Sequence, residues 1–298
     1  MNGELSARWH VPLEAAGWSF GSGFLVLCVL LALLPRLRRG MGTLVVAFRS
    51  REIRWWQCVG GMLGALLVAV QTYAVPLVGV AVFTVAVVAG QTSSGLAVDR
   101  AGLSPSGRVP VNRLRLLAAG LAVVGALVAS AARGGHSAVL WLPALLAVGV
   151  GATSAVQAAI NGHVNLRTGF PLSTTWLNFG MGVIMLAAVT LVHALVTRGS
   201  APWTLTAAPW WAWFGGVCGI GAVAVQAATV RRLGVLILAI ATLTGQLGAA
   251  LVLDIASPAT RGDVGPQLVA GVLITFAGAA VAGLSRRIRR TEATLTAR

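Results

Sequence analysis

Side-chain amides inside long apolar stretches are the residues of this sequence best able to do chemistry. Gln157 and Asn161 are four positions apart, so a helix presents them on one face, one turn beyond Ser154. An amide both donates and accepts hydrogen bonds, which suits an uncharged or zwitterionic polar ligand. Buried amides also join helices to one another at about 1 kcal/mol each, and this structural role stays open for every one of them. The candidate substrate-binding residues are Gln157, Asn161, Gln71, Gln226, Gln91, Gln246 and Asn178.

Carboxylates are scarce, with seven Asp and Glu in 298 residues. Only Asp99 and Asp254 border apolar stretches. We expect them either to act as gates that pair with Arg100 or another nearby arginine, or to be solvated acids at helix ends. Because no apolar stretch has a carboxylate at its centre, the sequence does not predict proton coupling through such a group.

Motifs of enzymes and metal sites do not occur in the sequence. It has no HExxH, GxSxG or GxxxxGK[ST] stretch, and its cysteines lack the spacing of metal ligands. The histidines and cysteines are scattered, at His10, His136, His163, His193, Cys28, Cys58 and Cys218. The sequence therefore predicts no enzyme, no metal, no cofactor and no disulfide.

The elements that must position the amides are membrane-spanning helices. The chain is 57% hydrophobic and 10% charged, with a mean hydropathy of +0.86, which is typical of an integral membrane protein. The apolar stretches reach the ~20 residues that a helix needs to cross a bilayer and lack the alternation of a barrel strand. About nine such spans are predicted, at residues 17–35, 57–74, 78–98, 114–133, 138–160, 173–196, 211–229, 234–254 and 266–285.

Two parts of the chain repeat each other. Residues 55–99 align without a gap with residues 210–254, and about 17 of the 45 positions are identical. A shorter block aligns residues 2–23 with residues 161–182. Its equivalent pairs include Asn2 and Asn161, Ser19 and Asn178, Phe20 and Phe179, and Gly23 and Gly182. The sequence thus predicts a duplicated unit.

The two predicted repeats cover residues 1–135 and 136–298, with four and five spans. The span at 138–160 has no counterpart in the first repeat, because the alignment places Met1 opposite Ile160. Either the natural protein has nine helices, or its start codon lies upstream and a tenth helix completes the first repeat. If the helix is absent, a homodimer or a partner helix is expected to fill its place.

Arginines fall mainly in alternate loops and in the C-terminal tail. The net charge is +15, but its placement between spans favours orientation in the membrane over nucleic-acid binding. By the positive-inside rule the arginine-rich side is cytoplasmic, with the C-terminus inside and the N-terminus, as written, outside. Equivalent loops then lie on opposite faces. This inverted topology is typical of secondary transporters that work by alternating access, whereas a membrane scaffold or a lipid-handling protein is the alternative.

Three stretches resemble the five-helix unit of the drug/metabolite transporter (DMT) superfamily, in its YdcZ-type branch of inner-membrane exporters with an EamA-like fold. They are QAAINGHVNLRTGFPLSTTWLNFGMG, PWWAWFGGVCG and RRLGVLILAIATLTGQLGAALVLD. The chain is similar to the fused, two-unit form. The resemblance implies an exporter of a small polar or amphipathic metabolite or drug in the plasma (inner) membrane. It names no cargo.

Small and aromatic residues recur at equivalent positions. Gly60, Gly61 and Gly64 stand opposite Gly215, Gly216 and Gly219, and we expect both sets to allow close helix packing. Trp pairs precede each set, at Trp55, Trp56, Trp210 and Trp211, where anchoring at the membrane interface is expected. The expected partners are a small-molecule substrate and the lipid bilayer.

Overall fold

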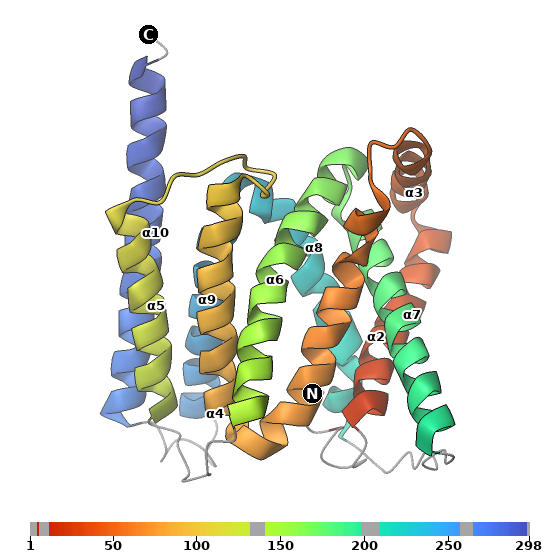
Figure 1. The fold of residues 1–298 in the computed structure, drawn as a ribbon, viewed down its shortest axis with the longest axis horizontal. Helices are drawn as coiled ribbons and strands as arrows, with labels where there is room; N and C mark the ends of the chain where they lie inside the picture. Colours follow the sequence, from red (N-terminus) through yellow and green to blue (C-terminus); the bar gives the residue numbers. More distant parts are fainter. Residues whose placement is uncertain (1–4, 6–11, 132–140, 198–208, 257–264, 297–298) are drawn as a thin grey trace. The chain divides into compact units, whose positions relative to one another are not determined.

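The fold is helical throughout the part of the chain that the computed structural model describes (Figure 1). It describes Leu5 and residues 12–131, 141–197, 209–256 and 265–296. The α-helices are α2 (Pro12–Leu33), α3 (Pro35–Arg49), α4 (Gly60–Ala101), α5 (Arg113–Ala131), α6 (Trp141–Thr168), α7 (Pro171–Thr197), α8 (Gly215–Leu233), α9 (Val235–Ala256) and α10 (Pro266–Thr296). Short 3-10 helices, η1 (Trp55–Val59) and η2 (Trp210–Phe214), precede α4 and α8. Asn2, Glu4, Arg8, His10, His136 and Asp263 lie outside the described residues, as do the side chains of His193 and Asp254.

The described helices are those of a membrane protein. Large apolar side chains remain exposed along them, for example Leu25 at 67% and Leu195 at 70%, which water would disfavour and lipid would not. Each of the nine predicted spans overlaps a helix. Six candidate spans are long and apolar enough to cross a bilayer: Leu13–Leu33, Trp55–Val75, Trp141–Thr168, Pro171–Val192, Trp210–Leu233 and Pro266–Ser285. The chain is therefore an all-helical, multi-pass membrane protein.

Glycines in the left-handed region end three helices. Gly102 (φ +74°) follows α4, Gly169 (φ +67°) follows α6 and Gly234 (φ +78°) follows α8. Glycine is favoured here because a Cβ is strained at positive φ. The amide of Gly169 donates to the carbonyl of Asn165 at 2.9 Å and closes α6. Asn161 therefore lies inside α6, which continues to Thr168 beyond the predicted end of the span at residue 160.

Two segments differ from the predicted arrangement. Residues 35–49, expected to be an arginine-rich loop, form α3, because Pro35 pre-organises the first turn and apolar residues follow at helical spacing. The two predicted spans 57–74 and 78–98 are assigned to one helical run, α4, which the boundary between the two units divides after Leu77. Pro76 lies next to this boundary, and a proline inside a helix removes one N–H donor and kinks or interrupts the helix.

Unit 1 is one of two compact units and comprises residues 1–77 and 156–232. It contains α2, α3, α7 and α8, with the first part of α4 and the last part of α6. Its core includes the rings of Phe20 in α2 and Phe179 in α7, whose centroids are 5.1 Å apart. The core keeps α2 and α7 side by side, and polar residues of α6 contact α7.

Unit 2 comprises residues 78–155 and 233–298. Its helices are α5, α9 and α10, with the second part of α4 and the first part of α6. In α5, Gly125 approaches Thr275 and the carbonyl of Gly271 of α10, and Gly278 of α10 approaches the carbonyl of Ala118. These two helices can pack closely because each has glycine where the other's backbone arrives.

Candidate functional site

A chain of buried amides crosses unit 1 between α6, α7 and α8. Asn178 Nδ2 donates to Asn161 Oδ1 at 3.1 Å. Gln157 Nε2 extends the chain to Asn178 Oδ1, and Asn161 Nδ2 extends it to Gln226 Oε1, each at 3.5 Å. Gln157, Asn161 and Asn178 are 6%, 3% and 2% exposed. The structure thus brings together four of the seven predicted binding residues.

Glycines of α4 leave space for this amide chain. A Cβ on Gly64 would lie 2.5 Å from Gln157 Nε2, and one on Gly60 would lie 2.8 Å from Asn161 Oδ1. Gly61 faces the backbone carbonyl of Asn178 even more closely. The close packing predicted for these three glycines therefore occurs against the polar residues of α6 and α7.

The amide chain consists of uncharged hydrogen-bonding groups. Its central bond has ordinary geometry, whereas the two 3.5 Å bonds are at the limit of a hydrogen bond. Each amide has one acceptor oxygen and two donor hydrogens, so the four together offer more donors and acceptors than these bonds use.

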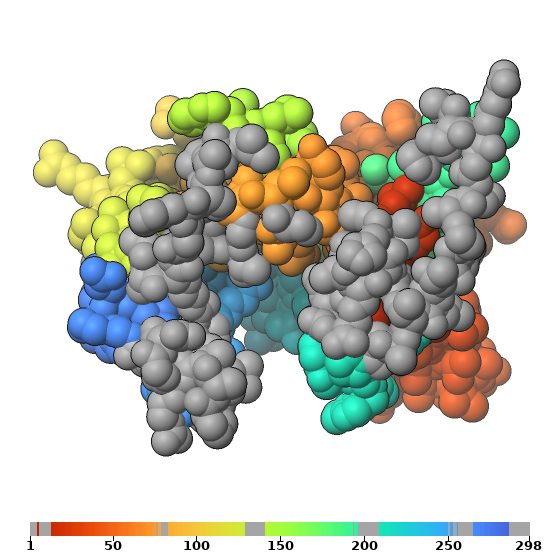
Figure 2. All heavy atoms as spheres, turned by 90° about the horizontal axis from the view of Figure 1, so that it is seen from below, coloured from red at the N-terminus to blue at the C-terminus, as the bar shows by residue number. Residues whose placement is uncertain are grey.

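The other three predicted binding residues do not join this chain. Gln71, the repeat equivalent of Gln226, is exposed on α4. Part of α4 reaches the surface in Figure 2 (orange). Gln91 is half-buried in unit 2 and Gln246 is exposed there. Gln226 is bonded to Asn161, and the repeat equivalent of Asn161 is Asn2. Asn2 lies outside the described residues.

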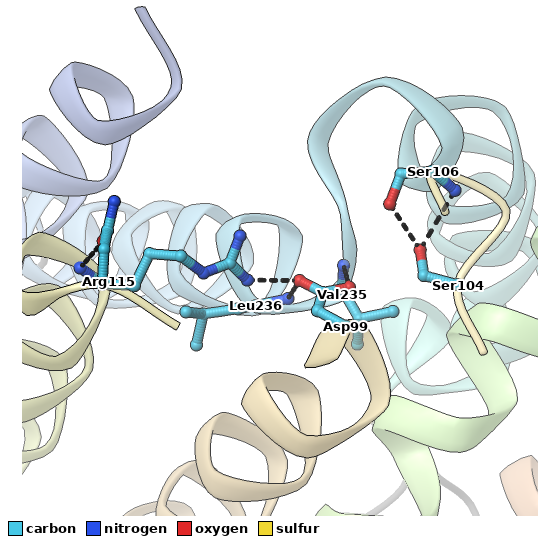
Figure 3. Close-up of polar contacts among 7 residues, drawn as sticks. Asp99, Ser104, Ser106, Arg115, Val235 and Leu236 are labelled. Carbon is cyan, nitrogen blue, oxygen red and sulfur yellow. Dashed lines mark hydrogen bonds and ion pairs between the residues drawn. The ribbon is translucent and has the colours of Figure 1, made fainter. Parts of the chain in front are cut away.

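Asp99 occupies a second polar cluster, in unit 2 (Figure 3). It is fully buried at the end of α4. Its Oδ1 accepts from the amide of Val235 at 2.9 Å, and its Oδ2 accepts from the amide of Leu236 at 3.2 Å and from the guanidinium of Arg115. The carboxylate therefore caps the positive N-terminus of α9 and pairs with an arginine of α5.

The backbone around Asp99 is also fixed. Its carbonyl accepts from the amide of Val109 at 2.8 Å, so the segment between α4 and α5 folds back on the end of α4. A Cβ on Gly234 would lie 3.0 Å from Asp99 Oδ2, at a position whose φ is +78°. Glycine at 234 thus satisfies both the backbone conformation and the space that the carboxylate needs.

Sequence reasoning placed Asp99 at a helix end and expected it to pair with Arg100 or another nearby arginine. Arg100 is exposed, and its carbonyl accepts from Arg108 Nε at 3.2 Å. Arg115 is the partner, and it is only 4% exposed. The signal that could have found it is Asn112, whose side chain accepts from the amide of Arg115 at 2.9 Å and caps α5.

Comparison with known proteins agrees with these features. The described residues form a multi-pass helical membrane protein whose unit 1 contains a buried cluster of uncharged polar side chains. Residues 1–128 and 142–295 match the family described as "putative inner membrane exporter, YdcZ", and the chain belongs to this family. The resemblance to YdcZ-type exporters is thereby confirmed. No curated protein matches the chain in sequence.

Proposed function

We propose that the protein is a secondary-active exporter of a small polar or amphipathic molecule, which it moves by alternating access between two inverted repeats. The buried amide chain carries this proposal. Polar groups inside hydrocarbon are costly, yet three of these four amides are almost fully buried. The chain that carries them belongs to a family described as exporters. The four linked amides include no carboxylate, so a neutral or zwitterionic cargo fits them better than a cation does.

Reciprocal contacts within unit 1 support the two-repeat arrangement. Gly23 lies against the ring of Phe179, and its equivalent Gly182 lies against the ring of Phe20. Both 3-10 helices precede their α-helices at aligned positions, and their first residues, Trp55 and Trp210, are 75% and 77% exposed. A duplicated unit related by a two-fold axis accounts for such pairs.

The division into units also favours duplication. The boundary after Leu77 and the boundary after Arg232 are equivalent positions in the alignment of residues 55–99 with residues 210–254. We propose nine described or partly described spans in inverted repeats, with the arginine-rich loops and the C-terminus in the cytoplasm.

The proposal is tested by transport. The gene would be expressed in an efflux-deficient bacterial strain, which is screened with toxic nucleoside and amino-acid analogues, and any compound to which it confers resistance is then measured as flux in proteoliposomes. Asn178→Leu and Gln157→Ala should reduce the apparent affinity about tenfold or more, because each leaves partner amides unpaired. Gln246→Ala is the matched control, since Gln246 is exposed and outside the amide chain.

The alternative functions give different results. A scaffold would confer no resistance to any compound, and its amide variants would change stability alone. A lipid-handling protein would move a fluorescent phospholipid between leaflets of the same proteoliposomes without moving the polar analogues. Either outcome would refute the proposed export.

A further inference from the structure

Helix α3 lies across its neighbours in unit 1. Figure 1 views α3 nearly end-on, whereas α2 and α7 run up the picture. Its buried residues, Leu37, Gly40, Leu44 and Ala47, recur every three or four positions and form one face. Gly40 fits against Ser173 and Phe170 at the start of α7. α3 is therefore held against the protein by one side only.

The opposite face of α3 combines arginine with exposed apolar residues. Arg38, Val45, Val46 and Arg49 share this face by helical geometry. Val45 and Val46 are 48% and 65% exposed, and Phe48 at its margin is 49% exposed. A helix that lies crosswise in a membrane protein with such a face is typical of the bilayer interface.

The arginines of α3 form few ion pairs within the part of the chain that the structure describes. Residues 35–54 contain six arginines and one acid, Glu52. Glu52 is already paired with Arg167 Nη1 at 3.2 Å. Among the described residues, no carboxylate forms an ion pair with the exposed guanidinium groups of Arg36, Arg38 and Arg39. These three exposed charges are therefore available to an anion from outside the chain.

We propose that α3 binds the head groups of anionic phospholipids. Arg36, Arg38 and Arg39 contact the phosphates, since a guanidinium matches a phosphate with paired hydrogen bonds. Val45 and Val46 insert beside the upper acyl chains. A lipid fits better than a soluble anion because Arg38 shares one helix face with Val45 and Val46, and a face that is both basic and apolar matches an amphipathic ligand.

The site belongs to one face of the membrane. Residues 194–209, which correspond to residues 35–54 in the second repeat, contain one arginine, Arg198. The anionic lipid therefore binds beside the first repeat, in one leaflet of the membrane. This inference does not depend on what the protein transports.

Lipid titration of the purified full-length protein tests the proposal. Native mass spectrometry would measure its affinity for dioleoylphosphatidylglycerol and dioleoylphosphatidylcholine. The triple variant Arg36→Gln, Arg38→Gln, Arg39→Gln should lose about tenfold or more of its affinity for phosphatidylglycerol alone. The control Arg113→Gln, Arg231→Gln, Arg232→Gln removes the same charge from other exposed arginines and should lose much less. Equal losses in the two triple variants, or no loss in either, would overturn the proposal.

A second measurement uses the wild-type protein and needs no variant to fold. Phenylglyoxal labels accessible arginines, and peptide mass spectrometry locates the label. In phosphatidylglycerol nanodiscs the arginines of α3 should be labelled several-fold more slowly than in phosphatidylcholine nanodiscs, while Arg231 and Arg232 change little. Equal labelling of α3 in both lipids would contradict the assignment.

Discussion

Gly61 of α4 packs against the backbone carbonyl of Asn178 in α7, so closely that a side chain at position 61 would overlap it. The reciprocal contact also exists, because Gly216 of α8 packs against the backbone carbonyl of Ser19 in α2. The two glycines are equivalent in the repeat alignment, and so are Ser19 and Asn178. Each helix pair thus depends on one glycine for its close approach.

Gly61→Ala should destabilise the protein by about 1–3 kcal/mol, because the new methyl group must push α4 away from α7. The midpoint of thermal unfolding in detergent measures this change. Gly221→Ala is the matched control, since nothing lies within 4 Å of its Cβ position in α8. It should leave the midpoint unchanged or raise it. A Gly61→Ala protein as stable as the control would mean that α4 and α7 do not pack as described.

Gly216→Ala should lower the unfolding midpoint by about as much as Gly61→Ala does, since both place a methyl group on an aligned backbone carbonyl. The same thermal measurement compares the two variants, again with Gly221→Ala as reference. A large effect at one glycine and none at the other would argue that the reciprocal contacts are unequal and that the repeats pack differently.

The sequence predicts two features of the amide chain: which amides share one helix face, and which residues are equivalent in the two repeats. Gln157 and Asn161 share a helix face by the period of 3.6 residues, and the repeat alignment singled out Gln226 and Asn178 as counterparts of Gln71 and Ser19. Their meeting depends on packing between α6, α7 and α8, which no period encodes. Gln71 shows the limit, because an identical residue at an equivalent position stays exposed.

The sequence was less informative about segments between spans. Arg115 looked like one more orienting arginine, and its burial against Asp99 depends on how the segment after α4 folds back. The helix α3 was not predicted, because the six arginines of residues 35–54 suggested a loop. The apolar residues of α3 nevertheless recur at helical spacing. The charge pattern and the apolar period describe different faces of the same helix.

Asn178→Leu should destabilise the protein by about 1–3 kcal/mol, because Asn161 Oδ1 and Gln157 Nε2 lose their partner inside unit 1. Asn178→Ser should cost less, since a hydroxyl keeps one donor and since serine is the residue at the equivalent position 19. The unfolding midpoints of both variants check this order. If leucine were tolerated better than serine, the amide chain would not contribute to the stability of the unit.

Asp99 and Arg115 should behave as one energetic unit. Asp99→Asn leaves the guanidinium of Arg115 buried without its counter-charge, and Arg115→Gln does the same to the carboxylate, so each should cost about 3–5 kcal/mol. The double variant removes both charges and keeps polar groups for the amides of Val235 and Leu236, and it should cost less than the sum of the two. A double-mutant cycle on the unfolding midpoints measures this coupling.

The exposed pair of Glu52 and Arg167 provides the control for that cycle. Its side chains are 51% and 55% exposed, so solvent screens their attraction, and Glu52→Gln with Arg167→Gln should show coupling of about 0–1 kcal/mol. Strictly additive effects at Asp99 and Arg115, as small as those at the exposed pair, would mean that the buried ion pair does not hold α4, α5 and α9 together.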